Sequence, residues 1–226
     1  MYIDVIVPVL NEEENIARQI ECVCKSPLLG RLIIVDGGSF DQTKNIAYKY
    51  KNIIWLETKS SRGFQQYLGG QHAQSEVLLF LHADVFLPES WDQCIVETFA
   101  DDAVVGGAFQ IQTFADPAMK SWANRLLFFA DWRSRYTKRP YGDQCIFVRK
   151  TAYDKIGGYP QQPLFEDYAF TKKISKIGNL VTRKEKVLVS GRRMQQRPLR
   201  SFFWMNVLPF LYKLGVSPDT LKKIYK

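Results

Sequence analysis

The stretch Val77-Leu78-Leu79-Phe80-Leu81-His82-Ala83-Asp84 joins five large apolar residues directly to a histidine and a carboxylate. Such a short apolar run is typical of a strand that is covered on both faces, as in a parallel sheet. Open α/β sheets bind ligands beyond the carboxyl ends of their strands, which is where His82 and Asp84 fall. Strand side chains two residues apart share a face, so these two are predicted to converge on one ion or phosphate. An exposed strand end would give the same pattern.

The first 84 residues alternate between predicted strands and helices. Apolar and β-branched runs predict strands at 3–9, 32–35, 53–56 and 77–81, and helices at 41–50 and 63–73. Another helix is predicted to begin with Asn11 as its N-cap and Glu14 at its third position. This order predicts an α/β fold with a Rossmann-like, mostly parallel, doubly wound sheet flanked by helices.

The order of elements becomes irregular after Asp84. Helices are predicted at 88–100, 118–135, 151–156 and 167–177, strands at 104–113 and 144–148, and a loop at 136–143. No internal repeat and no linker separates two cores, so residues 1–226 are predicted to form one domain. It divides into a nucleotide-binding half at 1–84, an acceptor half at 85–182 and a basic helical tail at 183–226.

The net charge of +8 is concentrated near the end of the sequence. Residues 1–182 contain 20 Lys and Arg against 21 Asp and Glu, whereas residues 183–226 contain 11 against 2. Four arginines of this tail precede an aromatic run: Arg192, Arg193, Arg197 and Arg200. We predict peripheral contact of residues 183–226 with an anionic membrane, and no nucleic-acid partner. A helix packed on the domain with a solvated basic face is the alternative.

Cysteine usage and the apolar runs indicate where the protein works. None of the four cysteines has the C-x-x-C spacing of a paired zinc site, and all are predicted to be reduced. Met1 leads straight into a predicted strand without the pattern of a signal peptide. The apolar stretch 201–214 is interrupted and too short to span a bilayer. We therefore expect a cytoplasmic protein, at the inner face of the cell membrane.

Three strand-end loops, at 8–12, 36–39 and 82–84, are predicted to lie side by side and to form a nucleotide pocket. Asp36 can accept hydrogen bonds from a base N–H or from ribose hydroxyls, and Gly37 lets the backbone approach a planar ring. A glycine-rich turn capped by Asp36 is the alternative. Neither a Gly-x-Gly-x-x-Gly pattern nor a Walker lysine indicates a dinucleotide or P-loop site.

Carboxylates suggest metal binding and proton transfer. Asp84 is a hard oxygen ligand suited to Mg²⁺ or Mn²⁺, which often take one or two protein carboxylates while a diphosphate completes the shell. Asp167, beside Glu166 at a predicted helix start, is a candidate general base, although helix capping explains it too. His82 is a candidate ligand of the metal, ribose or phosphate, or a histidine hydrogen-bonded within the sheet.

Two further pairs of residues flank the predicted pocket. Arg62 and Gln66 lie one turn apart at a helix start, where they could touch phosphates or sugar hydroxyls or be merely solvated. Asp143 ends the loop at 136–143 and Gln144 follows it, and both could shape an acceptor pocket.

Four motifs follow one another along nearly the whole chain. They are Pro8-Val9-Leu10-Asn11-Glu12-Glu13, Asp36-Gly37-Gly38-Ser39, His82-Ala83-Asp84 and Glu166-Asp167. In this order and at these separations they resemble family 2 glycosyltransferases with the GT-A fold. The segments 140–144, 157–160 and 211–218 look like a small, compact bacterial branch of that family.

This resemblance implies the inverting transfer of a sugar from a nucleotide-sugar donor, a UDP- or GDP-sugar, to a hydroxyl acceptor. It implies help from Mg²⁺ or Mn²⁺, held with the diphosphate by Asp84. Asp36 would contact the base and Glu12 the ribose or base region, while Pro8 and Asn11 belong to the same donor-side motif.

The same resemblance assigns the general base to Asp167. Our leading hypothesis adds an acceptor that is lipid-linked or otherwise hydrophobic. The sequence differs from the family at two positions, since His82 stands where an acid is common and Leu68 where an asparagine is frequent. Two rival functions predict other properties. A sugar nucleotidyltransferase would carry a basic, glycine-rich loop in place of residues 11–14, and a non-enzymatic polyanion-binding module would use only the tail.

Overall fold

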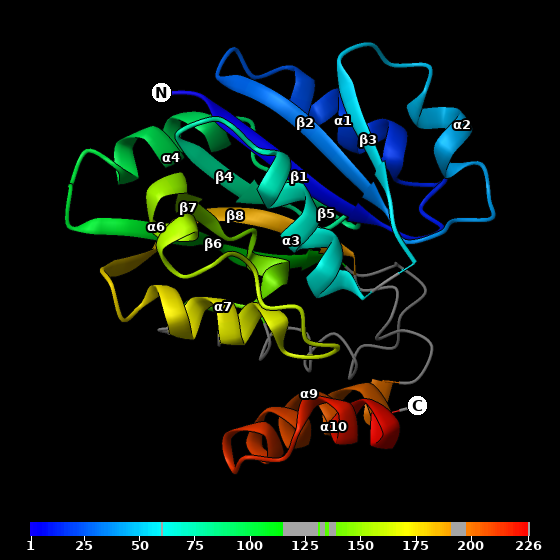
Figure 1. The fold of residues 1–226 in the computed structure, drawn as a ribbon, viewed down its shortest axis with the longest axis vertical. Helices are drawn as coiled ribbons and strands as arrows, with labels where there is room; N and C mark the ends of the chain where they lie inside the picture. The colour runs from blue at the N-terminus through cyan, green and yellow to red at the C-terminus, as the bar shows by residue number, and fades with distance from the viewer. Residues whose placement is uncertain (60, 115–130, 132–133, 136–138, 191–197, 226) are drawn as a thin grey trace.

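A computed structural model describes residues 1–59, 61–114, 131, 134–135, 139–190 and 198–225. Its strands form one eight-stranded sheet in the order β3-β2-β1-β4-β7-β6-β8-β5 (Figure 1). Their bounds are Ile3–Val9 (β1), Leu29–Asp36 (β2), Ile53–Glu57 (β3), Val77–Phe80 (β4), Val85–Phe86 (β5), Val104–Phe114 (β6), Phe147–Arg149 (β7) and Asn179–Ser190 (β8). The predicted helix at 118–135 falls almost wholly outside the described residues, as do Arg192, Arg193 and Arg197.

The first half of the sheet is parallel, as predicted. β1 lies between β2 and β4 and all seven of its residues are buried, which fits its six apolar residues. The seventh, Asp4, accepts hydrogen bonds from the Gln74 N–H (2.6 Å) and the Ser75 hydroxyl (2.6 Å). Pairing with β4 ends at Ile6 and Phe80, while pairing with β2 continues to Val9 and Asp36. Pro8, which has no N–H to donate, lies beyond the last β4 pair.

The second half of the sheet is mixed. β7 pairs antiparallel with β4 and β6, β8 pairs parallel with β6, and β5 closes the sheet antiparallel to β8. β8 was not predicted, and its residues 183–190 belong to the sheet and not to a helical tail. The strand predicted at 144–148 begins only at Phe147, because residues 142–144 form a 3₁₀ turn.

Helices cover both faces of the sheet. Their bounds are Ile16–Cys24 (α1), Thr43–Ala47 (α2), Arg62–His72 (α3), Trp91–Thr98 (α4), Gly142–Gln144 (η1), Lys150–Lys155 (α6), Glu166–Ile174 (α7), Pro198–Lys213 (α9) and Pro218–Tyr225 (α10). The predicted capping by Asn11 is wrong. Asn11 takes a left-handed conformation (φ 55°) and α1 begins five residues later, after Asn15.

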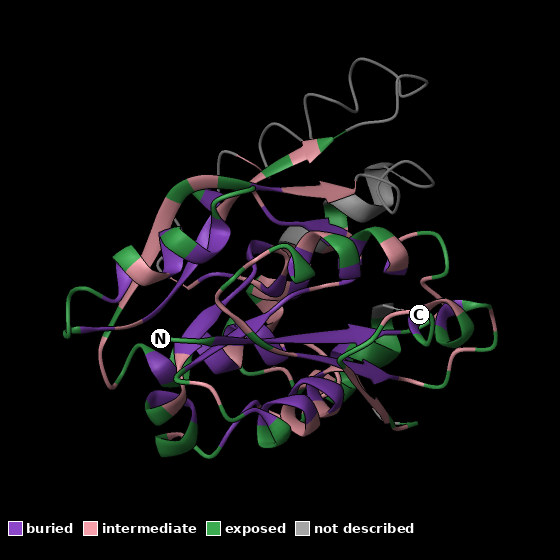
Figure 2. Ribbon diagram, turned by 90° about the horizontal axis from the view of Figure 1, so that it is seen from above, coloured by how far each residue is buried: buried purple, intermediate pink, exposed green. Residues whose placement is uncertain are grey.

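Two apolar cores fill the spaces between sheet and helices. Alternate residues of β1 contribute to each, with Val5 and Val7 in one core and Ile6 in the other. The first core includes residues of α1, α2 and α4, and the second includes residues of α3, α6 and α7. Buried residues accordingly fill the middle of the molecule in Figure 2. The carboxyl ends of β1, β2 and β4 are thereby fixed at one edge.

The C-terminal helices α9 and α10 form a separate layer at the bottom of Figure 1. α9 ends at Lys213. Gly215, two residues later, has a left-handed conformation (φ 94°) and donates its N–H to the Tyr212 carbonyl (3.1 Å), as is typical after a helix C-terminus. Among the helices of the described ranges, none has both the length and the apolar content that a membrane crossing needs.

Candidate active site

The loops after β1 and β2 lie side by side, as predicted, and are hydrogen-bonded to each other. The Asn11 N–H donates to Ser39 Oγ (2.9 Å), and Asn11 Oδ1 accepts from the Phe40 N–H (3.0 Å). The left-handed backbone at Asn11 lets it make both bonds. The next loop residue, Glu12, donates its N–H to Thr43 Oγ1 (2.8 Å). Residues 8–12 and 36–43 therefore form one wall, which we call the donor wall.

Asp36 closes the turn that carries Gly37. Its carboxylate is 4% exposed and accepts from the Ser39 N–H (3.0 Å) and the Ser39 hydroxyl (2.6 Å). The capping role anticipated as an alternative is therefore present. Gly37 donates its N–H to the Val9 carbonyl (2.9 Å), which ties this turn to the end of β1.

A buried amide on α3 holds the ends of β1 and β2 together. Gln65 is 5% exposed, and its Nε2 donates to the carbonyls of Val9 (2.9 Å) and Val35 (2.8 Å). A Cβ at Gly37 would come within 3.1 Å of the same nitrogen. Sequence reasoning missed Gln65, because a single glutamine in a helix gives no signal of which strands it will meet.

His82 and Asp84 do not extend β4, contrary to prediction. β4 ends at Phe80, and residues 82–85 form a turn in which the Val85 N–H donates to the His82 carbonyl (3.1 Å). Strand alternation therefore does not point these two side chains to one face. A second buried amide, Gln19 Nε2, fixes the turn by donating to the carbonyls of His82 (3.0 Å) and Val85 (2.8 Å).

Gly142 brings the turn at 82–85 close to Asp167. A Cβ at Gly142 would lie 2.5 Å from His82 Nε2 and 3.2 Å from Asp167 Oδ2. The imidazole and the carboxylate are thus within a few ångströms of each other, separated by a bare backbone. The Gly142 N–H donates to Asp167 Oδ2 (2.6 Å) and the Tyr168 N–H donates to Oδ1 (2.7 Å). These two bonds set the orientation of the carboxylate.

Asp84 and Asp143 lie near the same buried thiol. Burial raises the pKa of Cys145 well above its usual value, and the negative charges of Asp143 and Asp84 raise it further. Gln144, predicted on the acceptor side, points inward instead. It is 1% exposed, and its Nε2 donates to the Phe109 carbonyl (3.0 Å), so it positions η1.

The second wall, which we call the acid wall, is built from buried charges at the start of α7. Arg62 Nε contacts Glu166 Oε1 at 2.5 Å, and the side chains are 39% and 2% exposed. Burial lowers the pKa of Arg62, but the charges of Glu166 and Asp167 more than offset this and raise it overall. For Asp167, burial and the charge of Glu166 raise the pKa, while Arg62 and the two backbone N–H groups oppose the rise.

Two buried polar groups near this cluster have no hydrogen-bond partner among the described residues. Gln66 is fully buried with both amide atoms unsatisfied, and the Tyr159 hydroxyl is in the same state. Burial raises the pKa of Tyr159, and the charges of Asp167 and Glu166 add to the rise. Buried polar groups are nearly always satisfied in folded proteins, so an internal water is the partner expected for these atoms. Gln66, predicted to bind the donor, is buried away from the surface.

The described residues fit a divalent ion only together with a substrate. They contain no group of three or more His, Cys, Asp or Glu side chains that could hold a metal ion. Mg²⁺ and Mn²⁺ in phosphate chemistry commonly use one or two protein carboxylates, with substrate phosphates as the remaining ligands. Asp84, half-buried in a fixed turn, is a donor of that kind.

Comparison with known proteins identifies the family. The profile of glycosyl transferase family 2 matches residues 4–157, which is more than half of the chain. The chain belongs to glycosyl transferase family 2. A curated relative, the 4,4'-diaponeurosporenoate glycosyltransferase of Staphylococcus haemolyticus, is 27% identical over 106 residues. The match covers 43% of this chain and 28% of that relative, so the chain spans well under half of its length.

Solved structures share the fold of this family 2 chain. The structure of S. aureus TarS 1–349 has a TM-score of 0.67 at 17% identity, covering 100% of this chain and 69% of that chain. The mannosyltransferase PcManGT from Pyrobaculum calidifontis, in complex with GDP-Man and Mn²⁺, has a TM-score of 0.72 at 17% identity, covering 99% and 67%. The predicted family and GT-A fold are therefore confirmed. The functions assigned to individual site residues stay predictions.

Proposed function

We propose that this family 2 chain transfers a sugar from a nucleotide-sugar donor to a hydroxyl acceptor with inversion, using Asp167 as the general base. One observation carries the proposal. Gly142 lies between His82 and Asp167, so the turn that holds Asp84 and the acid wall border the same space. A base on one side and a diphosphate-binding carboxylate on the other are what an in-line displacement requires.

In this proposal the donor nucleotide lies along the donor wall. Asp36 and Glu12 contact the base and ribose, and Pro8, Asn11 and Gly37 provide the backbone surface beneath them. Support comes from related structures solved with nucleotides. S. aureus TarS was crystallised in complex with UDP-GlcNAc, and PcManGT in complex with GDP-Man. The donor is accordingly a UDP- or GDP-sugar.

The proton of the acceptor hydroxyl passes to Asp167 while its oxygen attacks the anomeric carbon and the bond to the diphosphate breaks. Hydrogen bonds from Gly142 and Tyr168 orient the carboxylate for this step. Burial and the neighbouring Glu166 raise the pKa of Asp167, which makes it a stronger base once ionised. Arg62 limits that rise, and its partly exposed guanidinium can also contact a phosphate.

Asp84 would hold Mg²⁺ or Mn²⁺ together with the diphosphate. When bound, such an ion neutralises the charge that develops on the departing nucleoside diphosphate. PcManGT and a mycobacterial glucosyl-3-phosphoglycerate synthase were both crystallised with Mn²⁺. We further propose that the acceptor is lipid-linked or otherwise hydrophobic, and that the reaction takes place at the cytoplasmic face of the membrane.

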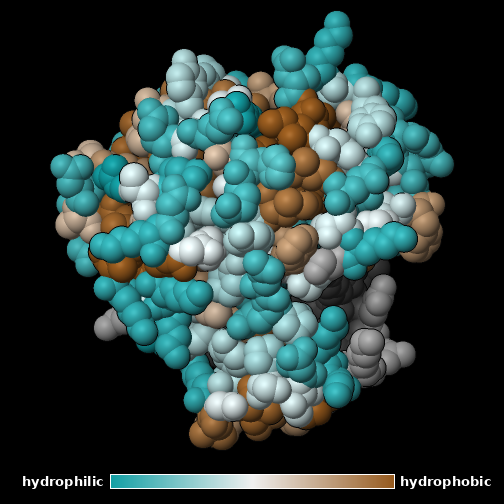
Figure 3. All heavy atoms as spheres, viewed as in Figure 1, coloured by the Kyte–Doolittle hydropathy of each residue, from teal (hydrophilic) through white to brown (hydrophobic). Residues whose placement is uncertain are grey.

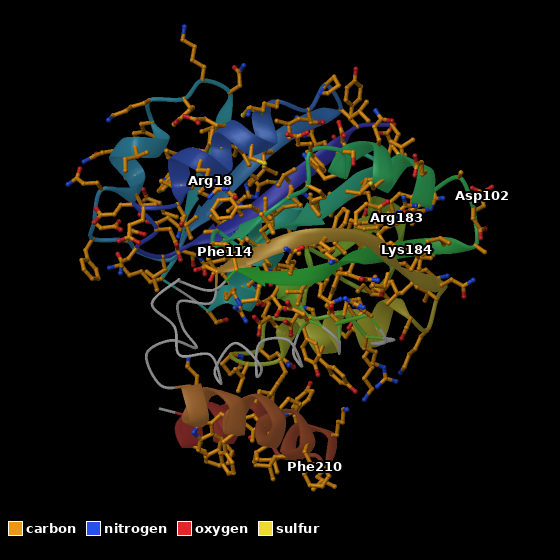
Figure 4. The ribbon with its side chains drawn as sticks, turned by 180° about the vertical axis from the view of Figure 1, so that it is seen from behind. Arg18, Asp102, Phe114, Arg183, Lys184 and Phe210 are labelled. Atoms are coloured by element: carbon orange, nitrogen blue, oxygen red, sulfur yellow. The ribbon has the colours of Figure 1, made fainter. Side chains whose placement is uncertain are left out.

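Thermal unfolding with nucleoside diphosphates, with and without Mn²⁺, tests the donor side. UDP or GDP should raise the melting temperature, and Mn²⁺ should increase the rise, because a ligand bound only to the folded state stabilises it. Asp84→Ala should remove the metal-dependent part. Asp102→Ala is the matched control, since this carboxylate is fully exposed at the far end of the molecule (Figure 4). Equal metal-dependent stabilisation of wild type and Asp84→Ala would overturn the assignment of Asp84.

A further inference from the structure

Helix α9 is attached to the segment that carries Glu166 and Asp167. The ring of Tyr212 stacks on Phe165 with 4.9 Å between centroids and meets Tyr168 edge-on at 5.8 Å. Its hydroxyl accepts a hydrogen bond from Gln162 Nε2 (3.2 Å). Leu208, one helical turn before Tyr212, is 5% exposed. Tyr212 and Leu208 therefore define the inner face of α9.

The opposite face of α9 exposes large apolar side chains. Phe203, Phe210 and Leu214 are 55%, 60% and 66% exposed. With about 3.6 residues per turn, spacings of seven and four residues align them in one stripe, and Tyr212 falls on the other side. Figure 4 shows Phe210 on the side of α9 that points away from the sheet, and Figure 3 shows hydrophobic residues gathered there. This stripe is the outer face of α9.

The helices that carry the outer face are rich in positive charge. Residues 198–226 contain five Lys and Arg against one Asp. Lys213, Lys222 and Lys223 are exposed, and Ile224 of α10 adds another apolar side chain that is 45% exposed. Aromatic and aliphatic residues bordered by lysines match the headgroup region of an anionic bilayer, where the rings enter the interface and the amines pair with lipid phosphates.

We propose that the outer face of α9, with the lysines of α9 and α10, is a docking surface for an anionic membrane. α9 then lies in the plane of the interface, with Phe203, Phe210 and Leu214 inserted among the headgroups. This docking proposal rests on the proposed function and adds to it the surface from which the acceptor is reached. Because Tyr212 contacts Phe165, the docked helix, about 10 Å thick with its side chains, lies between the lipid surface and the start of α7. A hydroxyl on a lipid-borne group long enough to pass α9 then reaches Asp167 from that side.

Flotation of the full chain with vesicles tests the docking surface. Wild type should float with vesicles of phosphatidylcholine and phosphatidylglycerol at low salt, less at high salt, and little with phosphatidylcholine alone. Phe210→Glu and Phe203→Glu should each weaken binding about tenfold, because each removes one inserted aromatic ring. Tyr2→Glu is the matched control, since Tyr2 is a similarly exposed aromatic residue (57%) and lies outside this layer. Thermal unfolding verifies that each variant is folded.

Several results would overturn the docking proposal. Wild type that stays in the soluble fraction, or a folded Phe210→Glu variant that floats like wild type, would do so. Size-exclusion chromatography showing a dimer that Phe210→Glu dissociates, without flotation, would assign the outer face to a second copy instead. The flotation contains no nucleotide, so a chain that binds UDP or GDP with Mn²⁺ but never floats keeps the proposed function and loses this inference alone.

Discussion

The two walls of the candidate site are held together by different chemistry. The strand ends beneath the donor wall and the turn at 82–85 are tied by neutral amides, since Gln65 bridges β1 and β2 and Gln19 fixes the turn. The acid wall depends on buried charges, in which Arg62 faces Glu166 and Asp167 is packed beside them. Amides do not titrate, whereas buried carboxylates do. These amide bridges should therefore keep their geometry over a wide pH range, and chemistry at the acid wall should respond to pH.

The largest expected effect comes from Asp167→Asn, which changes the acid wall and leaves the donor wall unchanged. Asparagine keeps the shape of the side chain but cannot take a proton, so sugar transfer should fall roughly 1,000-fold. Binding of UDP or GDP, measured by calorimetry, should change little because the donor wall is intact. Asp154→Asn, an exposed carboxylate paired with Lys150, is the control and should transfer normally. If Asp167→Asn keeps most of the wild-type turnover, Asp167 is not the general base.

Gly142→Ala should give the next largest effect, because it acts where the walls meet. The added Cβ would lie 2.5 Å from His82 Nε2 and 3.2 Å from Asp167 Oδ2, so both groups must move. A displacement of about 1 Å at a catalytic group costs about a hundredfold in rate. Overpacking should also lower the unfolding free energy by about 2 kcal/mol.

Gly157→Ala separates loss of stability from loss of the site. Gly157 has a left-handed backbone (φ 78°) and open space around its Cβ position. Alanine there should cost about 1 kcal/mol through backbone strain and leave the transfer rate unchanged. If Gly142→Ala transfers as well as Gly157→Ala, the close approach of His82 and Asp167 has no catalytic significance.

A smaller effect is expected from Gln65→Leu, which removes the amide bridge between the ends of β1 and β2 beneath the donor wall. Leucine leaves the buried carbonyls of Val9 and Val35 without their donor, which should cost about 2 kcal/mol in urea unfolding. Donor affinity should fall about tenfold, since 1.4 kcal/mol is a factor of ten and the loop at Gly37 loses its support. Gln93→Leu, on the exposed surface of α4, should do neither. If the folded Gln65→Leu variant binds the donor nucleotide as tightly as wild type, the bridge stabilises the sheet without supporting the donor site.

The parallel half of the fold could be predicted because its rules are local. An apolar run such as 77–81 indicates a strand buried on both faces, and alternation with helices implies parallel pairing. β8 was missed because its middle residues are charged, as in Arg183, Lys184 and Glu185, a pattern usual in exposed segments. Figure 4 shows Arg183 and Lys184 on this strand, where Arg183 is paired with Glu97 (2.8 Å).

The candidate site could be predicted only in part. Motif order identified the loops and the acids, but not the groups that position them. Gln19, Gln65 and Gly142 act through contacts with residues distant in sequence, and such contacts depend on packing that no local pattern encodes. The displacement of His82 and Asp84 from strand to turn has the same origin. β4 loses its pairing with β1 at Phe80, and the chain bends there.

The smallest effect is a shift in pH dependence confined to the acid wall. Burial and the negative charge of Glu166 raise the pKa of Asp167, so the base becomes protonated, and transfer slows, at a higher pH than for an ordinary aspartate. Glu166→Gln removes the like charge while Arg62 stays in place, so the pKa of Asp167 should fall and the acidic limb of the pH–rate profile should move to lower pH. Donor affinity should stay flat over the same range.

Glu97→Gln removes an exposed carboxylate that is also paired with an arginine, so it controls for the loss of a surface charge. Its acidic limb should coincide with that of wild type. If the acidic limb of Glu166→Gln instead moves to higher pH, the pKa of Asp167 has risen. Loss of the ion pair between Glu166 and Arg62 then raises this pKa more than removal of the negative charge of Glu166 lowers it. The acid wall would then act as one hydrogen-bonded unit, in which the geometry around Arg62, and not the charge of Glu166, sets the pKa of Asp167.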